Sequence, residues 1–148
     1  MARAENVLKV QFCSLSANES LARSLAGAYL MQLNPTVGEL ADVKCAVSEA
    51  VTNCIVHAYR GCIGKIVMSM SVYPDRRVKI EIRDRGCGID DIEQAMEPMF
   101  TTDRENERSG MGFTVMSSFM DKLRVASSPG KGTKVVMIKQ LSKLSDGK

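Results

Sequence analysis

The sequence predicts an α+β fold: a single-layer sheet, mixed but mainly antiparallel, with helices packed on one face. Two observations lead to this prediction. Alternating apolar and polar residues mark strands that come in neighbouring pairs joined by short turns, and apolar residues at helical spacing fill separate segments. Because paired strands and helices are segregated along the chain, the helices are expected to cover one face of one sheet.

The first half of the chain predicts a strand followed by two helices. Apolar and polar residues alternate over residues 7–13, which indicates a half-buried strand. Leucines and alanines at helical steps over residues 16–33 predict a helix that ends before a proline. Thr36, with Glu39 three residues later, forms a capping box, so a second helix is expected from there to about Tyr59.

The second half predicts two hairpins separated by a short helix. Residues 66–73 and 78–84 alternate on either side of a turn that begins with proline, which is typical of a β-hairpin. Residues 113–120 are apolar enough for a short buried helix. Residues 122–128 and 133–141, joined by the turn PGKG, predict the second hairpin.

The composition is that of one ordinary globular domain, expected to span residues 1–148 with a polar tail from about residue 140. The 20 basic and 17 acidic side chains include no dense basic run with aromatic residues, so no direct nucleic-acid binding is expected. The 5 cysteines are never spaced as C-x-x-C, which argues against a zinc site or disulfide framework and favours a reducing compartment. Without an apolar signal core or a run of about 18 apolar residues, we expect a cytoplasmic protein with no membrane span.

The segment SEAVTNCIVHAY, residues 48–59, carries three polar side chains at steps of four on a helix otherwise suited to a core. Glu49, Asn53 and His57 share an arc well apart from the apolar arc, so they must face water or a ligand. A solvated face is the plain alternative, but asparagine is a mediocre helix former and no Glu–Lys pair supports this edge. A carboxylate and an amide oxygen one turn apart suit a nucleophile's proton and a hard cation, whereas His57 needs no role beyond closing the helix.

Two glycine elements follow this helix. In DRGCGID, Asp84 ends a strand, and its acceptor-only carboxylate suits the exocyclic amine of adenine. Gly86 and Gly88 let the backbone lie close against a flat base, although a simple turn would also use them. In RSGMGF, Gly110 and Gly112 lead into a helix whose N–H groups attract phosphates, although G-x-G alone also suits a hinge.

In this order and spacing the motifs resemble the GHKL superfamily, which includes histidine kinases, heat-shock chaperones and DNA gyrase. They are E-x-x-x-N on a helix, D-x-G-x-G after a strand, G-x-G before a helix, and Gly132-Thr133 opening the last strand. Neither a Walker A sequence nor eukaryotic-type kinase motifs occur. Within the superfamily, ANESLARS, NPTVGELADVKCAVSEAVTNCIVHAY, EPMFTTDRENERSGMGFTVMSSFMD and GKGT are similar to the anti-sigma-F family of endospore-forming bacteria, whose members are serine-protein kinases. The resemblance runs from about Leu8 to Ile138 and implies a Bergerat-type ATP-binding fold.

The resemblance also implies a role for each matching residue. Glu49 would be the general base that accepts the proton of a substrate serine, and Arg108 would neutralise charge at the γ-phosphate. Asn53 would bind Mg²⁺, whose other ligands would be phosphate oxygens and water. Asp84 would read adenine with support from Thr133. Four glycines would lie against the base or hold the phosphates: Gly86, Gly88, Gly110 and Gly112.

The implied activity is that of an anti-sigma factor with ATP and Mg²⁺ as cofactors. It would bind and inhibit a sporulation sigma factor through Glu19 and Arg23, and it would phosphorylate a serine of an anti-anti-sigma antagonist by partner switching. The family further implies a homodimer. For Glu19 and Arg23, four residues apart on a helix, a local ion pair with no partner is the plain alternative.

Other functions remain open from the sequence. Another anti-sigma kinase of the same group, such as a stress-response regulator, is the closest alternative, and a GHKL ATPase switch without kinase activity is the second. A sensor histidine kinase is disfavoured because no dimerisation helix with a phospho-acceptor histidine precedes these motifs. A nucleotide-gated binding module without chemistry would not require the base that Glu49 supplies.

Overall fold

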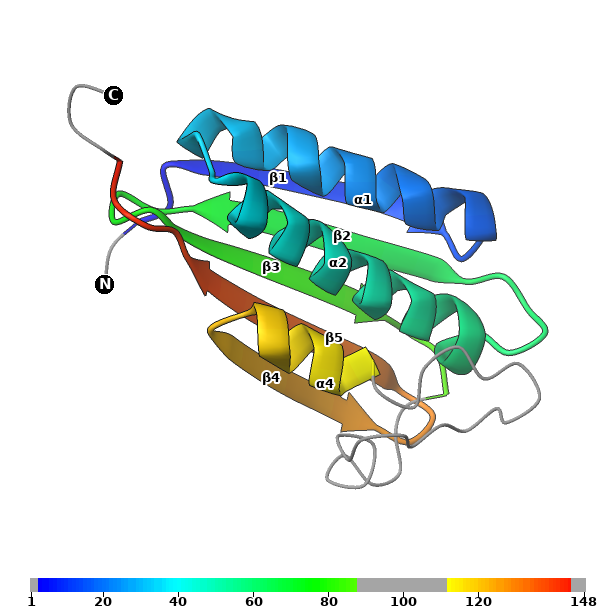
Figure 1. Cartoon of the computed structure of the whole chain (residues 1–148). Helices are drawn as coiled ribbons and strands as arrows, with labels where there is room; N and C mark the ends of the chain where they lie inside the picture. The colour runs from blue at the N-terminus through cyan, green and yellow to red at the C-terminus, as the bar shows by residue number, and fades with distance from the viewer. Residues whose placement is uncertain (1–2, 88–111, 145–148) are drawn as a thin grey trace.

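The computed structural model describes residues 3–87 and 112–144. In this part of the chain one sheet carries its helices on a single face (Figure 1). The strands lie in the order β1 (Asn6–Cys13), β2 (Lys65–Val72), β3 (Arg77–Asp84), β5 (Gly132–Gln140) and β4 (Lys122–Ser128). The helices are α1 (Ser16–Leu30), α2 (Val37–Asn53) and α4 (Gly112–Phe119). The expected α+β class is confirmed, and every strand pair described is antiparallel.

The two hairpins meet at the middle of the sheet. β2 and β3 pair through one turn, β4 and β5 through another, and β3 then pairs with β5. The register of this last pair sets Asp84 opposite Thr133. The last residue of β3 and the first residues of β5, which are far apart in the sequence, therefore lie side by side at one end of the sheet (Figure 1).

The start of α2 follows the predicted capping box. The Glu39 backbone N–H donates to Thr36 Oγ1 at 3.0 Å, and the Thr36 N–H donates to Glu39 Oε1 at 2.9 Å. These two bonds satisfy N–H groups that a helix start leaves without partners. Before the cap, Asn34 adopts a left-handed conformation with φ of 47°, which ends the 3-10 turn Met31–Leu33 after α1.

The end of α2 changes geometry rather than stopping. Residues Cys54–Ala58 continue as a π-helical turn, in which the Tyr59 N–H donates to the Cys54 carbonyl oxygen five residues back, at 3.1 Å. The predicted extent to about Tyr59 is therefore confirmed, but the widened turn was not predicted. Such turns shift the register of the side chains that follow, and they are frequent at functional sites.

The core lies between the sheet and α2. Val47 and Val51, from the predicted apolar arc, are fully buried against the inward-facing residues of β2 and β3. Burying one such side chain stabilises a fold by about 1.5–3 kcal/mol. Methionines fill much of the remaining space: Met68, Met70, Met116, Met120 and Met137. This packing fixes which edge of α2 faces away from the sheet.

Polar contacts join the helices to the last strand. Lys139 Nζ lies 3.1 Å from Asp42 Oδ2 on α2 and donates to the Phe119 carbonyl oxygen at the end of α4, at 2.7 Å. Beyond β5, Leu141 is buried and the Ser142 N–H donates to Glu39 Oε2 at 2.7 Å. The packed part of the chain thus extends to residue 142.

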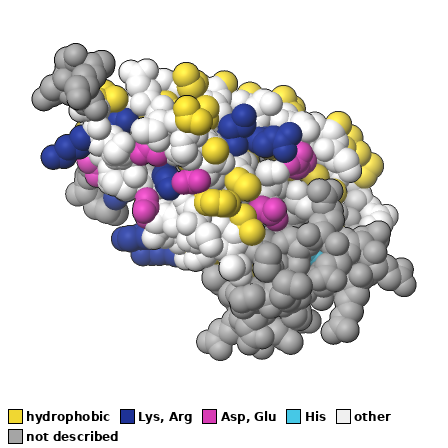
Figure 2. All heavy atoms as spheres, in the orientation of Figure 1, with side chains coloured by type: hydrophobic (Ala, Val, Ile, Leu, Met, Phe, Trp, Pro, Cys, Tyr) yellow, Lys and Arg dark blue, Asp and Glu magenta, His cyan; other side chains and the backbone are white. Residues whose placement is uncertain are grey.

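The helical face carries side chains of both charge signs close together, with apolar side chains between them (Figure 2). None of the helices within residues 3–87 and 112–144 is both long enough and apolar enough to cross a bilayer.

Candidate nucleotide site

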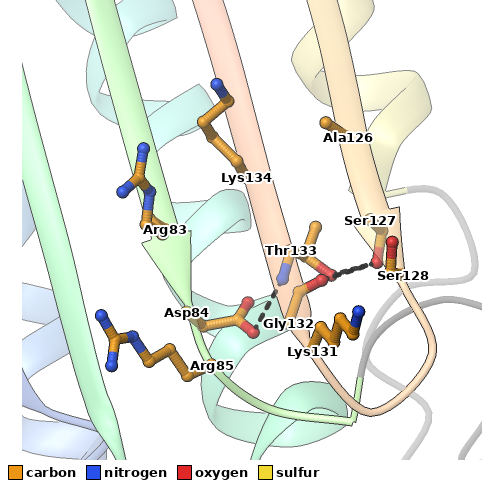
Figure 3. Close-up of a pocket in the computed structure, with 10 residues that line it drawn as sticks. All are labelled: Arg83, Asp84, Arg85, Ala126, Ser127, Ser128, Lys131, Gly132, Thr133 and Lys134. Carbon is orange, nitrogen blue, oxygen red and sulfur yellow. Dashed lines mark hydrogen bonds between the residues drawn. The ribbon is translucent and has the colours of Figure 1, made fainter.

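Asp84 is a buried carboxylate at the end of β3, with 6% of its surface exposed. Its Oδ1 accepts the N–H of Gly86 at 2.9 Å and the N–H of Thr133 at 3.2 Å. Figure 3 shows the side chain directed across the sheet toward Thr133. The contact between these two residues runs through the Thr133 backbone, while the Thr133 hydroxyl lies 2.7 Å from Ser127 Oγ on β4. Buried carboxylates need such donors, and here two backbone N–H groups anchor the Oδ1 atom of Asp84.

Glycines allow the backbone to close around this carboxylate. A side chain at Gly86 would collide with the carbonyl group of Ala58 at the end of α2. Gly132 has a φ of +99°, and a side chain there would collide with the Asp84 carbonyl group. The sequence suggested that Gly86 allows approach to a base; the structure adds that it packs against the end of α2.

Several bonds fasten the end of α2 to the end of β3. The Tyr59 hydroxyl donates to the Lys65 carbonyl oxygen at 2.7 Å and accepts the Arg85 N–H at 2.6 Å. Burial raises the pKa of Tyr59, so this hydroxyl stays protonated. The Cys87 N–H donates to the Ala58 carbonyl oxygen at 3.0 Å. As a result, α2 residues near position 53 lie at the same end of the sheet as Asp84.

The polar edge of α2 is half-buried at this end. Glu49, Asn53 and His57 each keep part of their surface exposed. The Asn53 amide makes no hydrogen bond to any residue that the structure describes, which leaves its oxygen available to a ligand. Within the described ranges no group of three or more His, Cys, Asp or Glu side chains could hold a metal ion. A single amide oxygen such as that of Asn53 suits a cation of the Mg²⁺ type, which takes one or two protein oxygens and completes its shell with phosphates and water.

A hollow of about 380 Å³ opens beside Asp84, where β3 and β4 end and β5 begins. Four basic side chains line it together with Asp84 and Thr133: Arg83, Arg85, Lys131 and Lys134 (Figure 3). Glu81, which lies 3.8 Å from both Arg83 and Lys134, offsets only part of this charge. Arg83 and Lys134 alternate along their strands with the buried Ile82 and Val135, so their positive charge favours an anion on the sheet face opposite the helices.

The remaining expected nucleotide residues are placed only in part. Helix α4 begins at Gly112, as the G-x-G motif predicted. Gly88, Arg108 and Gly110 lie outside the described residues.

The predicted partner residues lie apart from Asp84, on α1. Arg23 Nη1 is 2.9 Å from Glu19 Oε1, with the two side chains 41% and 20% exposed. Glu19 also accepts a hydrogen bond from the Ser48 hydroxyl on α2, and Arg23 Nη1 lies 3.5 Å from the same hydroxyl. The pair is therefore more than a local contact on one helix, since it joins α1 to the residue that precedes Glu49.

Sequence reasoning missed three residues that shape the site. Cys54 donates a thiol hydrogen bond to Asp84, Tyr59 bridges two strand ends, and Ser127 pairs with Thr133. Cys54 directly follows Asn53, a position that could have drawn attention to it. The partners of Tyr59 and Ser127 depend on the strand register, which the sequence does not reveal.

Comparisons with known proteins identify the family to which the chain belongs. The model of the histidine kinase-like ATPase domain family matches residues 13–139. The anti-sigma F factor of Caldanaerobacter subterraneus subsp. tengcongensis is 53% identical over 138 residues, which cover 93% of this chain and 96% of the relative. The chain belongs to the anti-sigma F factor family. The Bacillus subtilis member is 48% identical over 140 residues, covering 94% of this chain and 95% of the relative.

Solved structures support the fold of this anti-sigma F factor family member. The RsbU and RsbW domains of a Mycobacterium tuberculosis protein match with a TM-score of 0.70 and 18% identity, covering 95% of this chain and 34% of that one. A blue-light activated histidine kinase of Erythrobacter litoralis matches with a TM-score of 0.56 and 19% identity, covering 80% of this chain and 40% of that one. At these identities the likeness shows the fold alone.

Proposed function

We propose that this chain is an anti-sigma factor and an ATP-dependent protein-serine kinase. It binds a sporulation sigma factor and keeps it inactive, and it uses ATP with Mg²⁺ to phosphorylate a serine of an anti-anti-sigma antagonist. The observation that carries the proposal is a contact between the residue that follows α2 and the last residue of β3. Asp84 at the end of β3 contacts Cys54, the residue directly after Asn53 on α2, at 3.4 Å. This contact supports the assignment of adenine recognition to Asp84 and of the phosphate side to the polar edge of α2.

In the proposed site the two ends of ATP are held by different elements. Asp84 accepts the exocyclic amine of adenine, and the turn containing Gly86 and Gly88 lies against the base. Gly112 at the start of α4 and the preceding Gly110 are assigned to the phosphates, to which their N–H groups would donate. Asn53 would hold Mg²⁺, which when bound neutralises phosphate charge.

The chemical step is assigned to Glu49. Its carboxylate takes the proton from the substrate serine as the serine oxygen attacks the γ-phosphorus, and ADP leaves. Arg108 is assigned to the charge that develops on the γ-phosphoryl group. Phosphoryl transfer depends chiefly on positioning and charge neutralisation, and a general base contributes roughly 10²- to 10⁴-fold.

The partner face is assigned to α1. In the ATP-bound state a homodimer captures the sigma factor through Glu19 and Arg23. The unphosphorylated antagonist displaces the sigma factor and is then phosphorylated on serine. The relatives reported above carry the name anti-sigma F factor, which favours a sigma-F-type target over that of a stress-response kinase.

Capture of the sigma factor tests the anti-sigma half of this proposal. The purified chain is immobilised and offered a sigma-F-type sigma factor with ATP, with ADP or with no nucleotide, in the presence of Mg²⁺. We expect retention with ATP to exceed retention with ADP, and addition of unphosphorylated antagonist to release the sigma factor. Failure to retain the sigma factor in all three conditions would rule out the anti-sigma function.

A further inference from the structure

The two carboxylate oxygens of Asp84 have unequal surroundings. Oδ1 accepts two backbone N–H groups, those of Gly86 and Thr133. Oδ2 accepts one hydrogen bond from the described residues, from Cys54 Sγ at 3.4 Å. A carboxylate oxygen can accept two hydrogen bonds, so Oδ1 is satisfied while Oδ2 keeps capacity for a further donor. Oδ2 is therefore the atom that would accept the amine of adenine.

Cys54 donates one hydrogen bond to Oδ2 and leaves this oxygen able to accept a second one. The residue is 4% exposed and opens the π-helical turn directly after Asn53. A thiol donates only a weak hydrogen bond, so Oδ2 keeps capacity for a second donor.

We propose that Cys54 is a positioning residue for nucleotide recognition: its thiol fixes the rotation of the Asp84 carboxylate and keeps Oδ2 directed at the exocyclic amine of adenine. The proposal rests on the proposed function, since it concerns how that site reads its nucleotide. The rotation matters because hydrogen bonds weaken steeply away from linear geometry. Without the thiol, only Oδ1 would be held, and the carboxylate could turn about the bond that carries it.

The test compares two nucleotides that differ only at the amine. ATP carries the exocyclic amine, whereas purine riboside triphosphate lacks it. Binding of both is measured by calorimetry for the wild-type chain and for Cys54→Ala, which removes the donor. We expect Cys54→Ala to weaken ATP binding about three- to tenfold and to leave purine riboside triphosphate binding unchanged, as loss of one hydrogen bond predicts. Cys54→Ser, which keeps a donor, is expected to retain most of the discrimination.

Each of the following results would overturn the proposal. Equal weakening of both nucleotides in Cys54→Ala would indicate that the residue only packs the core. If Cys54→Ala prefers ATP over purine riboside triphosphate as strongly as the wild-type chain does, the hydrogen bond does not matter. The same follows if Cys54→Ser loses this preference as completely as Cys54→Ala. A wild-type chain that binds both nucleotides equally would contradict the adenine site itself, and so would be distinguishable from failure of the Cys54 role alone. Thermal unfolding of each variant verifies that the fold is retained.

Discussion

Asp84 Oδ1 lies 3.2 Å from the backbone nitrogen of Thr133, its partner in the register between β3 and β5. The same oxygen accepts the Gly86 N–H. The carboxylate is consequently both a structural acceptor and the group we assign to adenine. A substitution at Asp84 is therefore expected to change both the local backbone contacts and nucleotide binding.

Asp84→Ala is expected to weaken ATP binding roughly five- to 150-fold, because loss of a buried charge-assisted hydrogen bond costs about 1–3 kcal/mol. Calorimetry with ATP measures the effect, and Asp84→Asn, which keeps an acceptor for the Thr133 N–H, separates nucleotide recognition from local structure. GTP offers a carbonyl where adenine offers an amine, so the wild-type chain should bind it poorly. Equal ATP and GTP affinities of the wild-type chain would contradict the adenine site.

Gly132→Ala is expected to destabilise the fold by about 1–3 kcal/mol, because φ is +99° and the added methyl group would collide with the Asp84 carbonyl group. Gly130→Ala is the matched control. Gly130 also has a positive φ, of +76°, but an added methyl group there meets nothing within 4 Å. Denaturant unfolding compares the two. If Gly132→Ala lowers the free energy of unfolding no more than Gly130→Ala does, the close approach of Gly132 to Asp84 does not contribute to stability.

The capping box of α2 should make stability depend on pH. Burial tends to raise the pKa of Glu39, but hydrogen bonds from Thr36 and Ser142 outweigh it and leave the pKa below the ordinary value of 4.5. A lowered folded-state pKa gives stability that is present above the unfolded-state value and is lost as pH falls through the folded-state value. Glu39→Gln should therefore reduce the loss of melting temperature between about pH 6 and pH 3.

Thr36→Ala provides the control for this prediction. It removes the other half of the box and should cost about 0.5–2 kcal/mol at both pH values, because the threonine hydroxyl does not titrate. A Glu39→Gln variant with the same pH profile as the wild-type chain would show that other carboxylates dominate acid unfolding.

Glu49→Gln should separate catalysis from binding. The substitution keeps the shape of the side chain and removes the base, so we expect ATP affinity within a few-fold of wild type and a transfer rate lower by at least about 10²-fold. Single-turnover phosphorylation measures the rate, and calorimetry measures the affinity. Normal phosphorylation by this variant would place the base elsewhere.

Arg23→Ala should weaken sigma-factor binding by about tenfold or more, since a desolvated charge contact across an interface costs about 2–5 kcal/mol to break. The melting temperature should change little, because exposed ion pairs contribute about 0–1 kcal/mol. Arg124→Ala, at an exposed position on β4, is the control for loss of one positive charge. If the Arg23 variant binds the sigma factor as tightly as the wild-type chain, Arg23 is not part of the partner site. The ion pair of Glu19 and Arg23 would then only join α1 to Ser48.

Local sequence patterns were sufficient for much of the fold. The alternation in residues 78–84 and the capping box of Thr36 and Glu39 involve near neighbours, so their periodicity predicts β3 and the start of α2. The π-helical turn after Asn53 was not predictable, because its five residues are too few to alter the helical periodicity of the whole segment. It depends on how the end of α2 docks against β3.

The site was predictable only where one residue type suits one chemistry. Asp84 was singled out because a carboxylate ends a strand before glycines and the other motifs follow in order, and its role toward adenine stays a prediction. Its hydrogen bond from Cys54 joins residues thirty positions apart, and the contact of Glu19 with Ser48 joins two helices. Such contacts depend on helix rotation and strand register, which no local pattern specifies.

Transfer of phosphate from ATP to an antagonist serine is the most direct test of the proposed kinase. The chain, Mg²⁺ and γ-labelled ATP are incubated with a candidate anti-anti-sigma protein or with its variant that has alanine at the acceptor serine, and Glu49→Gln replaces the wild-type chain in a parallel series. We predict label on the antagonist only when both the serine and Glu49 are present. Label that is absent from the antagonist while ATP is hydrolysed, or label that persists with Glu49→Gln, would contradict the account.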